Sequence, residues 1–98
     1  MNTATNFMDK IQTHIDLYIP GEWKRESEEY SGSIKLRLYL VDKIHIWVNK
    51  DTNKGGIQFD APGKQGFKKG SKYLFKLDSD DNIVNSEELI LDLLNKFF

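Results

Sequence analysis

The two histidines, His14 and His45, are the side chains best suited to acid–base chemistry, because imidazole titrates near neutral pH. Neither has a nucleophile or a carboxylate at the spacing of a catalytic pair, and the chain contains no cysteine. A metal site that joins both histidines to Asp42 or Asp60 is an open alternative that the spacing does not favour. We therefore expect solvated or core-edge histidines and predict no catalytic residue, no metal site and no cofactor.

Lysines gather between residues 50 and 76, where seven of them stand against two aspartates. Aromatic rings lie among these lysines, and that combination is typical of proteins that hold single-stranded nucleic acid. The residues that would do so here are Lys54, Lys64, Phe67, Lys68, Lys69 and Lys72. The alternative is that the lysines hydrate two loops, which we expect at one end of the sheet, while the rings fill the core. The total charge of only −1 weakens the nucleic-acid hypothesis.

Residues 78–82, DSDDN, begin like a calcium-binding loop but do not continue as one. Ile83 stands where that loop needs glycine, and Leu89 stands where it needs a bidentate glutamate. We interpret this segment as a turn before a helix.

Aromatic residues supply a third kind of candidate site. The pattern places Trp23, Tyr30, Tyr39 and Trp47 away from the buried side of their strands, and Arg37 shares the side of Tyr39 and Trp47. Aromatic residues and arginine are enriched at the centres of protein interfaces. If a helix covered this second side, the rings would simply be core. We predict that these five residues form a partner-binding surface.

Two amphipathic helices and a central hairpin must position these residues. Residues 7–18 show an apolar stripe at helical spacing and end before Pro20-Gly21. Strict alternation over residues 34–49 predicts a β-hairpin whose aliphatic side chains face one way. A last helix begins at Asn85 or Ser86, with two glutamates in its first turn.

The remaining segments are less regular. Residues 57–59 and 73–77 read as short third and fourth strands, whereas residues 22–30 are polar and form either a loop or an irregular edge strand. The chain, 98 residues long, therefore predicts one α+β domain over residues 1–98. We expect an antiparallel sheet of four or five strands, flat, curled or barrel-like, packed with an N-terminal and a C-terminal helix in the order α-β-β-β-β-α.

Such a chain is expected to be a small non-enzymatic binding protein that acts through its surface on a macromolecular partner. Another protein ranks first as that partner, in the manner of an inhibitor, immunity-type or accessory factor. A single-stranded nucleic-acid-binding module ranks second and an enzyme third. Without an apolar run near 18 residues or a visible signal peptide, we expect a cytoplasmic protein with no membrane partner. A homodimer is expected if Phe97-Phe98 or one side of the strands is uncovered.

Overall fold

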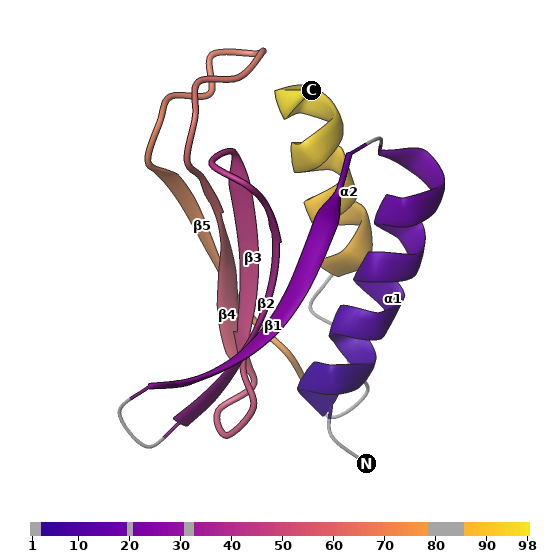
Figure 1. The fold of residues 1–98 in the computed structure, drawn as a ribbon, viewed down its shortest axis with the longest axis vertical. Coiled ribbons are helices and arrows are strands. Elements are labelled where there is room, and N and C mark those ends of the chain that lie inside the picture. The colour runs from indigo at the N-terminus through magenta and orange to yellow at the C-terminus, as the bar shows by residue number, and fades with distance from the viewer. Residues whose placement is uncertain (1–2, 20, 31–32, 79–85) are drawn as a thin grey trace.

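A five-stranded antiparallel sheet and two helices make up the fold. The structure, a computed structural model, describes residues 3–19, 21–30, 33–78 and 86–98. The elements are α1 (Thr3–Tyr18), β1 (Trp23–Tyr30), β2 (Ser33–Leu40), β3 (Ile44–Asn49), β4 (Lys54–Phe59), β5 (Ser71–Lys76) and α2 (Ser86–Phe97). Figure 1 shows both helices on the same side of the sheet. The predicted α+β class, with one helix before the sheet and one after it, is confirmed.

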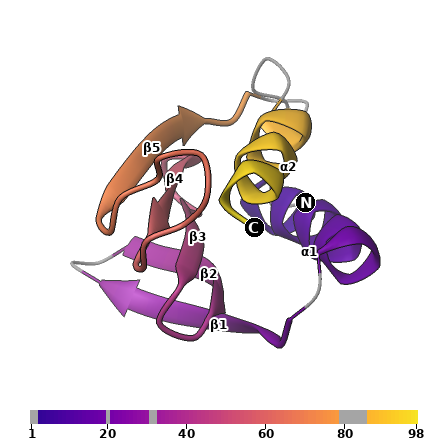
Figure 2. The same ribbon diagram turned by 90° about the horizontal axis from the view of Figure 1, so that it is seen from above.

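The sheet is a simple meander, because the strands stand side by side in the order β1-β2-β3-β4-β5 and each pairs antiparallel with the next. The sheet curves around the helices (Figure 2). It does not close into a barrel, because β1 and β5 remain its two edges. The expected order contained one strand fewer. The polar segment before the hairpin is a regular strand, paired with β2 from Trp23↔Leu40 to Tyr30↔Ser33.

The inner face of the sheet, which the helices cover, carries the core. The aliphatic ladder of the hairpin turns to this side, as expected, and is joined by β4; its buried members are Leu36, Leu38, Ile44, Ile46, Val48, Ile57 and Phe59. The helices cover it with a second buried set, which comprises Phe7, Met8, Ile11 and Ile15 of α1 and Ile90, Leu94 and Phe97 of α2. Each large aliphatic side chain buried in this way contributes about 1.5–3 kcal/mol.

Helix α1 begins four residues earlier than the apolar stripe predicted, and buried Ala4 extends that stripe by one turn. In α2, Glu87 and Glu88 lie in the first turn and Lys96 in the last, an order that the helix dipole favours. Asn85, the other expected cap, and residues 79–82 of the calcium-like segment lie outside the described residues. Within those residues, neither helix is long and apolar enough to cross a membrane.

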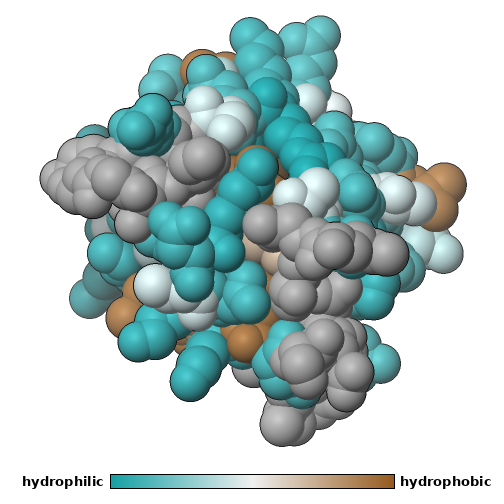
Figure 3. All heavy atoms as spheres, turned by 90° about the horizontal axis from the view of Figure 1, so that it is seen from below, coloured by the Kyte–Doolittle hydropathy of each residue, from teal (hydrophilic) through white to brown (hydrophobic). Residues whose placement is uncertain are grey.

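The two lysine-bearing loops lie at opposite ends of the sheet, so the expectation that they share one end is wrong. Successive turns of a meander alternate between ends, and Figure 1 shows the β3–β4 turn at the bottom and the β4–β5 loop at the top. Lys50 therefore lies far from Lys68 and Lys69. Viewed from the lower end, the described surface is mostly hydrophilic, with small separate hydrophobic patches (Figure 3).

Candidate functional site

The side of the sheet that faces away from the helices is uncovered, and we call it the outer face. Two rows of residues cross all five strands on it. The first runs Glu26, Arg37, Trp47, Gly56, Leu74, and the second runs Lys24, Tyr39, His45, Gln58, Lys72. Lys54 pairs with Lys76 beyond the first row. A sandwich with one helix on each side would have buried these residues, but both helices lie on the inner face (Figure 2).

Trp47 sits at the middle of the first row, and its indole covers Gly56 on the neighbouring strand. A Cβ atom at residue 56 would lie only 2.6 Å from Cη2 and 2.7 Å from Cζ2 of that indole. Glycine in a strand interior often marks such a close approach, because it leaves the space that a side chain would fill. Beyond Gly56 in the same row, Leu74 is 74% exposed. The row therefore presents a large aromatic ring and an exposed aliphatic side chain together.

Two cations lie over aromatic rings on the outer face. The Lys72 ammonium is 5.3 Å from the centre of the Trp47 ring, and the Arg37 guanidinium is 4.8 Å from the centre of the Tyr39 ring. Such pairs are worth about 0.5–1 kcal/mol where they are exposed. Each pair places a positive charge beside a flat aromatic ring.

The charge of the outer face is positive although the whole chain is close to neutral. Five cations, Lys24, Arg37, Lys54, Lys72 and Lys76, project from four of the five strands. Glu26, Asp60 and, in the β2–β3 turn, Asp42 are the carboxylates that oppose them among the described side chains. Lys54 and Lys76 stand directly opposite each other across β4 and β5. Like charges placed in this way repel, so this pair lowers the stability of the sheet slightly.

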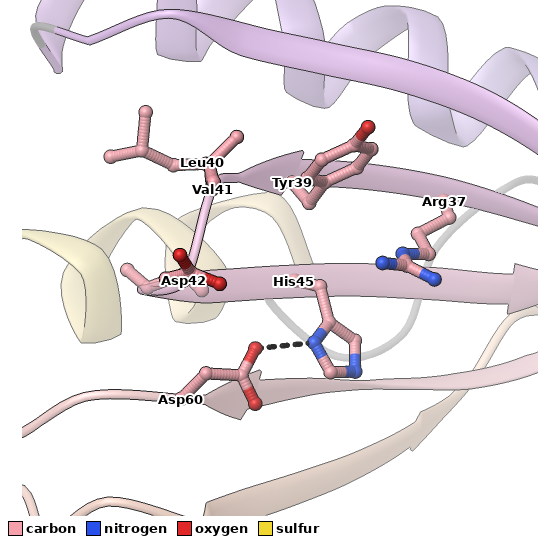
Figure 4. Close-up of a pocket in the computed structure, with 8 residues that line it drawn as sticks. Arg37, Tyr39, Leu40, Val41, Asp42, His45 and Asp60 are labelled. Atoms are coloured by element: carbon pink, nitrogen blue, oxygen red, sulfur yellow. Dashed lines mark hydrogen bonds and ion pairs between the residues drawn. The ribbon is translucent and has the colours of Figure 1, made fainter.

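His45 and Asp60 form the most ordered polar contact on this side. Nδ1 of His45 and Oδ2 of Asp60 are 2.6 Å apart, and because a carboxylate can only accept, Nδ1 carries the hydrogen (Figure 4). Nε2 of Gln58 donates to the other oxygen of Asp60 at 2.8 Å. The imidazole also lies 5.4 Å from the Trp47 ring, measured between centroids. Asp60 therefore fixes the orientation of a ring that supports Trp47.

The same pair lines a cavity of about 160 Å³ together with Arg37, Tyr39 and Asp42 (Figure 4). An imidazole held by a carboxylate can act as a general base through its second nitrogen. This volume is below the ~300–1,000 Å³ of ordinary ligand pockets. Among the described residues that line it there is no serine, threonine or lysine to serve as a nucleophile. The arrangement that an enzyme would need is therefore present only in part.

The predicted partner-binding residues fall into three groups. Arg37, Tyr39 and Trp47 lie together on the outer face, as the alternation indicated. The expected position of Trp23 is wrong: it pairs with Leu40 on the inner side and packs against the core. The side chain of Tyr30 lies outside the described part, and its backbone pairs with Ser33.

The residues of the nucleic-acid alternative are also divided. Lys54 and Lys72 lie on the outer face, whereas Lys64, Lys68 and Lys69 lie in the β4–β5 loop and are exposed there. Phe67 packs against the core, with its ring centre 4.6 Å from that of Phe59, so it is not free to stack on a ligand. The structure thus brings together only part of the lysine cluster.

Six described residues of the outer face were not singled out from the sequence: Lys24, Glu26, Gly56, Gln58, Leu74 and Lys76. The glycine pair in β4 was a usable signal, because a glycine inside a strand indicates a close neighbour. Leu74 and Lys76 follow from the alternation of β5 once Tyr73 and Phe75 are placed inside. Lys24 had no signal, since the residues of its strand from Lys24 to Glu29 are all polar.

His14 lies apart from His45, on the helix side of the sheet. Its Nε2 is 3.9 Å from a Glu87 carboxylate oxygen on α2, and Lys10 lies 3.7 Å from the other oxygen of the same group. The two histidines therefore do not meet in a common metal site. Among the residues that the structure describes, no group of three or more potential metal ligands occurs.

No protein family model, no curated protein and no solved structure matches this chain. The function of the chain is therefore inferred from the chemistry of the outer face.

Proposed function

We propose that this protein is a small non-enzymatic binding protein whose outer face holds a macromolecular partner. The supporting observation is the row through Trp47, in which a tryptophan, an arginine and an exposed leucine stand on an uncovered sheet. Tryptophan and arginine are the side chains that most often dominate binding energy at interfaces. Rigid strands hold the row, so little conformational entropy is lost when a partner binds.

The charge of the outer face adds a requirement on the partner. A surface whose described side chains include five cations and three carboxylates is complementary to a negative surface, and it repels a positive one. A partner protein would have to present carboxylates around an apolar centre. From the sequence, a protein ranked first as the partner. That prediction now carries the condition that the partner's surface is negatively charged.

Site-specific photocrosslinking tests whether the outer face is the binding surface. A photoreactive amino acid is placed at Leu74, which is 74% exposed on the outer face, or at Leu17, which is 69% exposed on α1. Both versions of the full chain are irradiated in a lysate of the cells that make the protein. We expect discrete adducts from position 74 and few from position 17. Digestion of the adducts with protease or with nuclease identifies the class of the partner.

The control is the same experiment in a Trp47→Ala background. Loss of the central ring should remove the adducts formed at position 74, because a few central side chains carry most of the binding energy. Equal labelling from positions 74 and 17, or adducts at position 74 that persist without Trp47, would refute the proposal. Circular dichroism of each variant establishes that the fold is retained.

A further inference from the structure

We propose that the partner held by the outer face is single-stranded nucleic acid. This inference depends on the proposed function and names the class of its partner. The sequence alone suggested that the lysine-rich loops would bind nucleic acid; here the binding surface is the outer face of the sheet. The residues that carry it are the two cation–aromatic pairs and the opposed lysines Lys54 and Lys76.

Trp47 and Tyr39 are positioned as stacking platforms. Trp47 covers Gly56 on the sheet side, and Lys72 occupies the space over its ring. A base stacked on an aromatic ring contributes more than an exposed cation–π contact, so a base displaces the lysine from the ring. The displaced ammonium remains beside the base and can pair with its phosphate. On the next strand, Arg37 likewise lies over the ring of Tyr39.

The charges of Lys54 and Lys76 face each other across the last two strands. No ion pair neutralises either lysine within the described residues. Opposed like charges are unfavourable in the free protein, and a phosphate bound between them turns the repulsion into attraction. Nucleic acid supplies one phosphate per nucleotide, so a strand that crosses the sheet can reach both this pair and Lys72.

The two aromatic platforms favour a single strand over a duplex or an acidic protein as the ligand. The flat faces of bases are hidden inside a duplex, and stacking on Trp47 or Tyr39 needs them free. A broad curved sheet also has no helix or two-stranded ribbon with which to enter a groove. An acidic protein surface would satisfy the cations but offers no regular series of π faces to the two aromatic platforms. Among anionic partners, only single-stranded nucleic acid uses both features.

Fluorescence anisotropy with a labelled 15-nucleotide thymidine oligonucleotide tests the inference on the full chain. If four cations each contact one phosphate, the slope of log affinity against log salt is about −2.8. Affinity should then fall roughly 50-fold between 50 and 200 mM NaCl. A blunt-ended duplex of the same length and poly-L-glutamate serve as competitors and should displace the oligonucleotide only weakly.

Matched variants separate stacking from charge. We expect Trp47→Ala to weaken binding about 5- to 150-fold, as the loss of one stacked base would. The aromatic control is Tyr18→Ala on α1, which is 69% exposed and should have no effect. We expect the double variant Lys54→Ala/Lys76→Ala to reduce the salt slope by about 1.4. Its control is Lys96→Ala on α2, an exposed lysine away from the outer face.

Three outcomes would overturn the inference: no binding at 50 mM NaCl, binding that Trp47→Ala and Tyr18→Ala affect equally, or displacement by poly-L-glutamate as strong as by unlabelled oligonucleotide. The variant Lys72→Glu tests the same face if Trp47→Ala is poorly folded, and it should also weaken binding. Nuclease-resistant, protease-sensitive adducts at position 74 without oligonucleotide binding would leave the outer face as a protein-binding surface. If neither adducts at position 74 nor oligonucleotide binding is observed, the proposed function is refuted as well.

Discussion

Replacing Gly56 with alanine tests whether the Trp47 indole rests on the sheet. A Cβ at residue 56 would lie 2.6 and 2.7 Å from two indole carbons and 2.8 Å from the carbonyl oxygen of Tyr73. All three distances are well below the ~3.5–4.0 Å of a normal carbon contact. Overpacking of this kind costs about 1–3 kcal/mol. We therefore expect Gly56→Ala to lower the free energy of unfolding by about that amount.

A double-mutant cycle divides this cost between its two sources. In a Trp47→Ala background the indole is gone and only the Tyr73 carbonyl still opposes the new methyl group. The cost of Gly56→Ala should therefore fall, by at least ~0.5 kcal/mol, when Trp47 is absent. Equilibrium urea unfolding followed by far-ultraviolet circular dichroism measures all four proteins, because the signal arises mainly from the backbone and persists without Trp47.

Additive effects within ~0.3–0.5 kcal/mol would refute the reasoning, because they would show that the indole and residue 56 do not touch. Gly66→Ala is the matched control. A Cβ there would meet nothing within 4 Å, but the φ of +78° is a left-handed conformation that alanine adopts at a cost of about 1 kcal/mol. This cost should be the same with and without Trp47, since it arises from the backbone alone.

Other substitutions distinguish the core from the outer face. Phe59→Ala should lower the free energy of unfolding by about 3–5 kcal/mol in urea titrations, because the ring is fully buried. Leu74→Ala should change it by less than ~0.5 kcal/mol, since that side chain is 74% exposed. Asp60→Ala should cost about 1–3 kcal/mol, because His45 then loses its acceptor. Asp60→Asn retains an acceptor oxygen and should cost less; an equal loss of thermal stability in both variants would contradict this role for the hydrogen bond.

The central hairpin was predictable because its two strands alternate strictly between aliphatic and other side chains. One side of the hairpin is buried, so a register slip of one residue would point all of its aliphatic side chains toward the solvent. The register and the inner face therefore follow from the pattern. Strand β1 carried no such signal. Its sequence WKRESEEY is polar on both sides, and it becomes a regular strand only because β2 pairs with it along its length.

The position of Trp23 shows the consequence of that missing signal. Nothing inside a polar strand determines which of its residues face the core, so its register had to come from the partner strand. Pairing with Leu40 places Trp23 on the inner side, where its ring packs against the core. The side of the sheet on which each helix lies was equally unpredictable. An apolar stripe shows that a helix covers something, but it does not show which face is covered.

The lysine cluster was defined by closeness in sequence, whereas the outer face is defined by alternation across strands. Phe67 and Lys69 are near neighbours of Lys72 along the chain, yet Phe67 turns into the core and Lys69 lies in the β4–β5 loop. Conversely, Arg37 and Lys72 come from β2 and β5 and lie on the same side. Counting charges by segment therefore grouped some residues of the outer face with others that lie elsewhere.

The two sides of the molecule carry opposite charge, and this bears on how a polyanion would approach. The helices contribute five carboxylates, Asp9, Asp16, Glu87, Glu88 and Asp92, against Lys10 and Lys96. Arg25 of β1 pairs with Asp9, which neutralises part of this charge. A negatively charged strand is thus repelled from the helix side and attracted to the sheet side, so the field of the protein orients the encounter before contact. A near-neutral total charge then becomes compatible with polyanion binding, because the opposing charges are separated by the thickness of the fold rather than mixed on one surface.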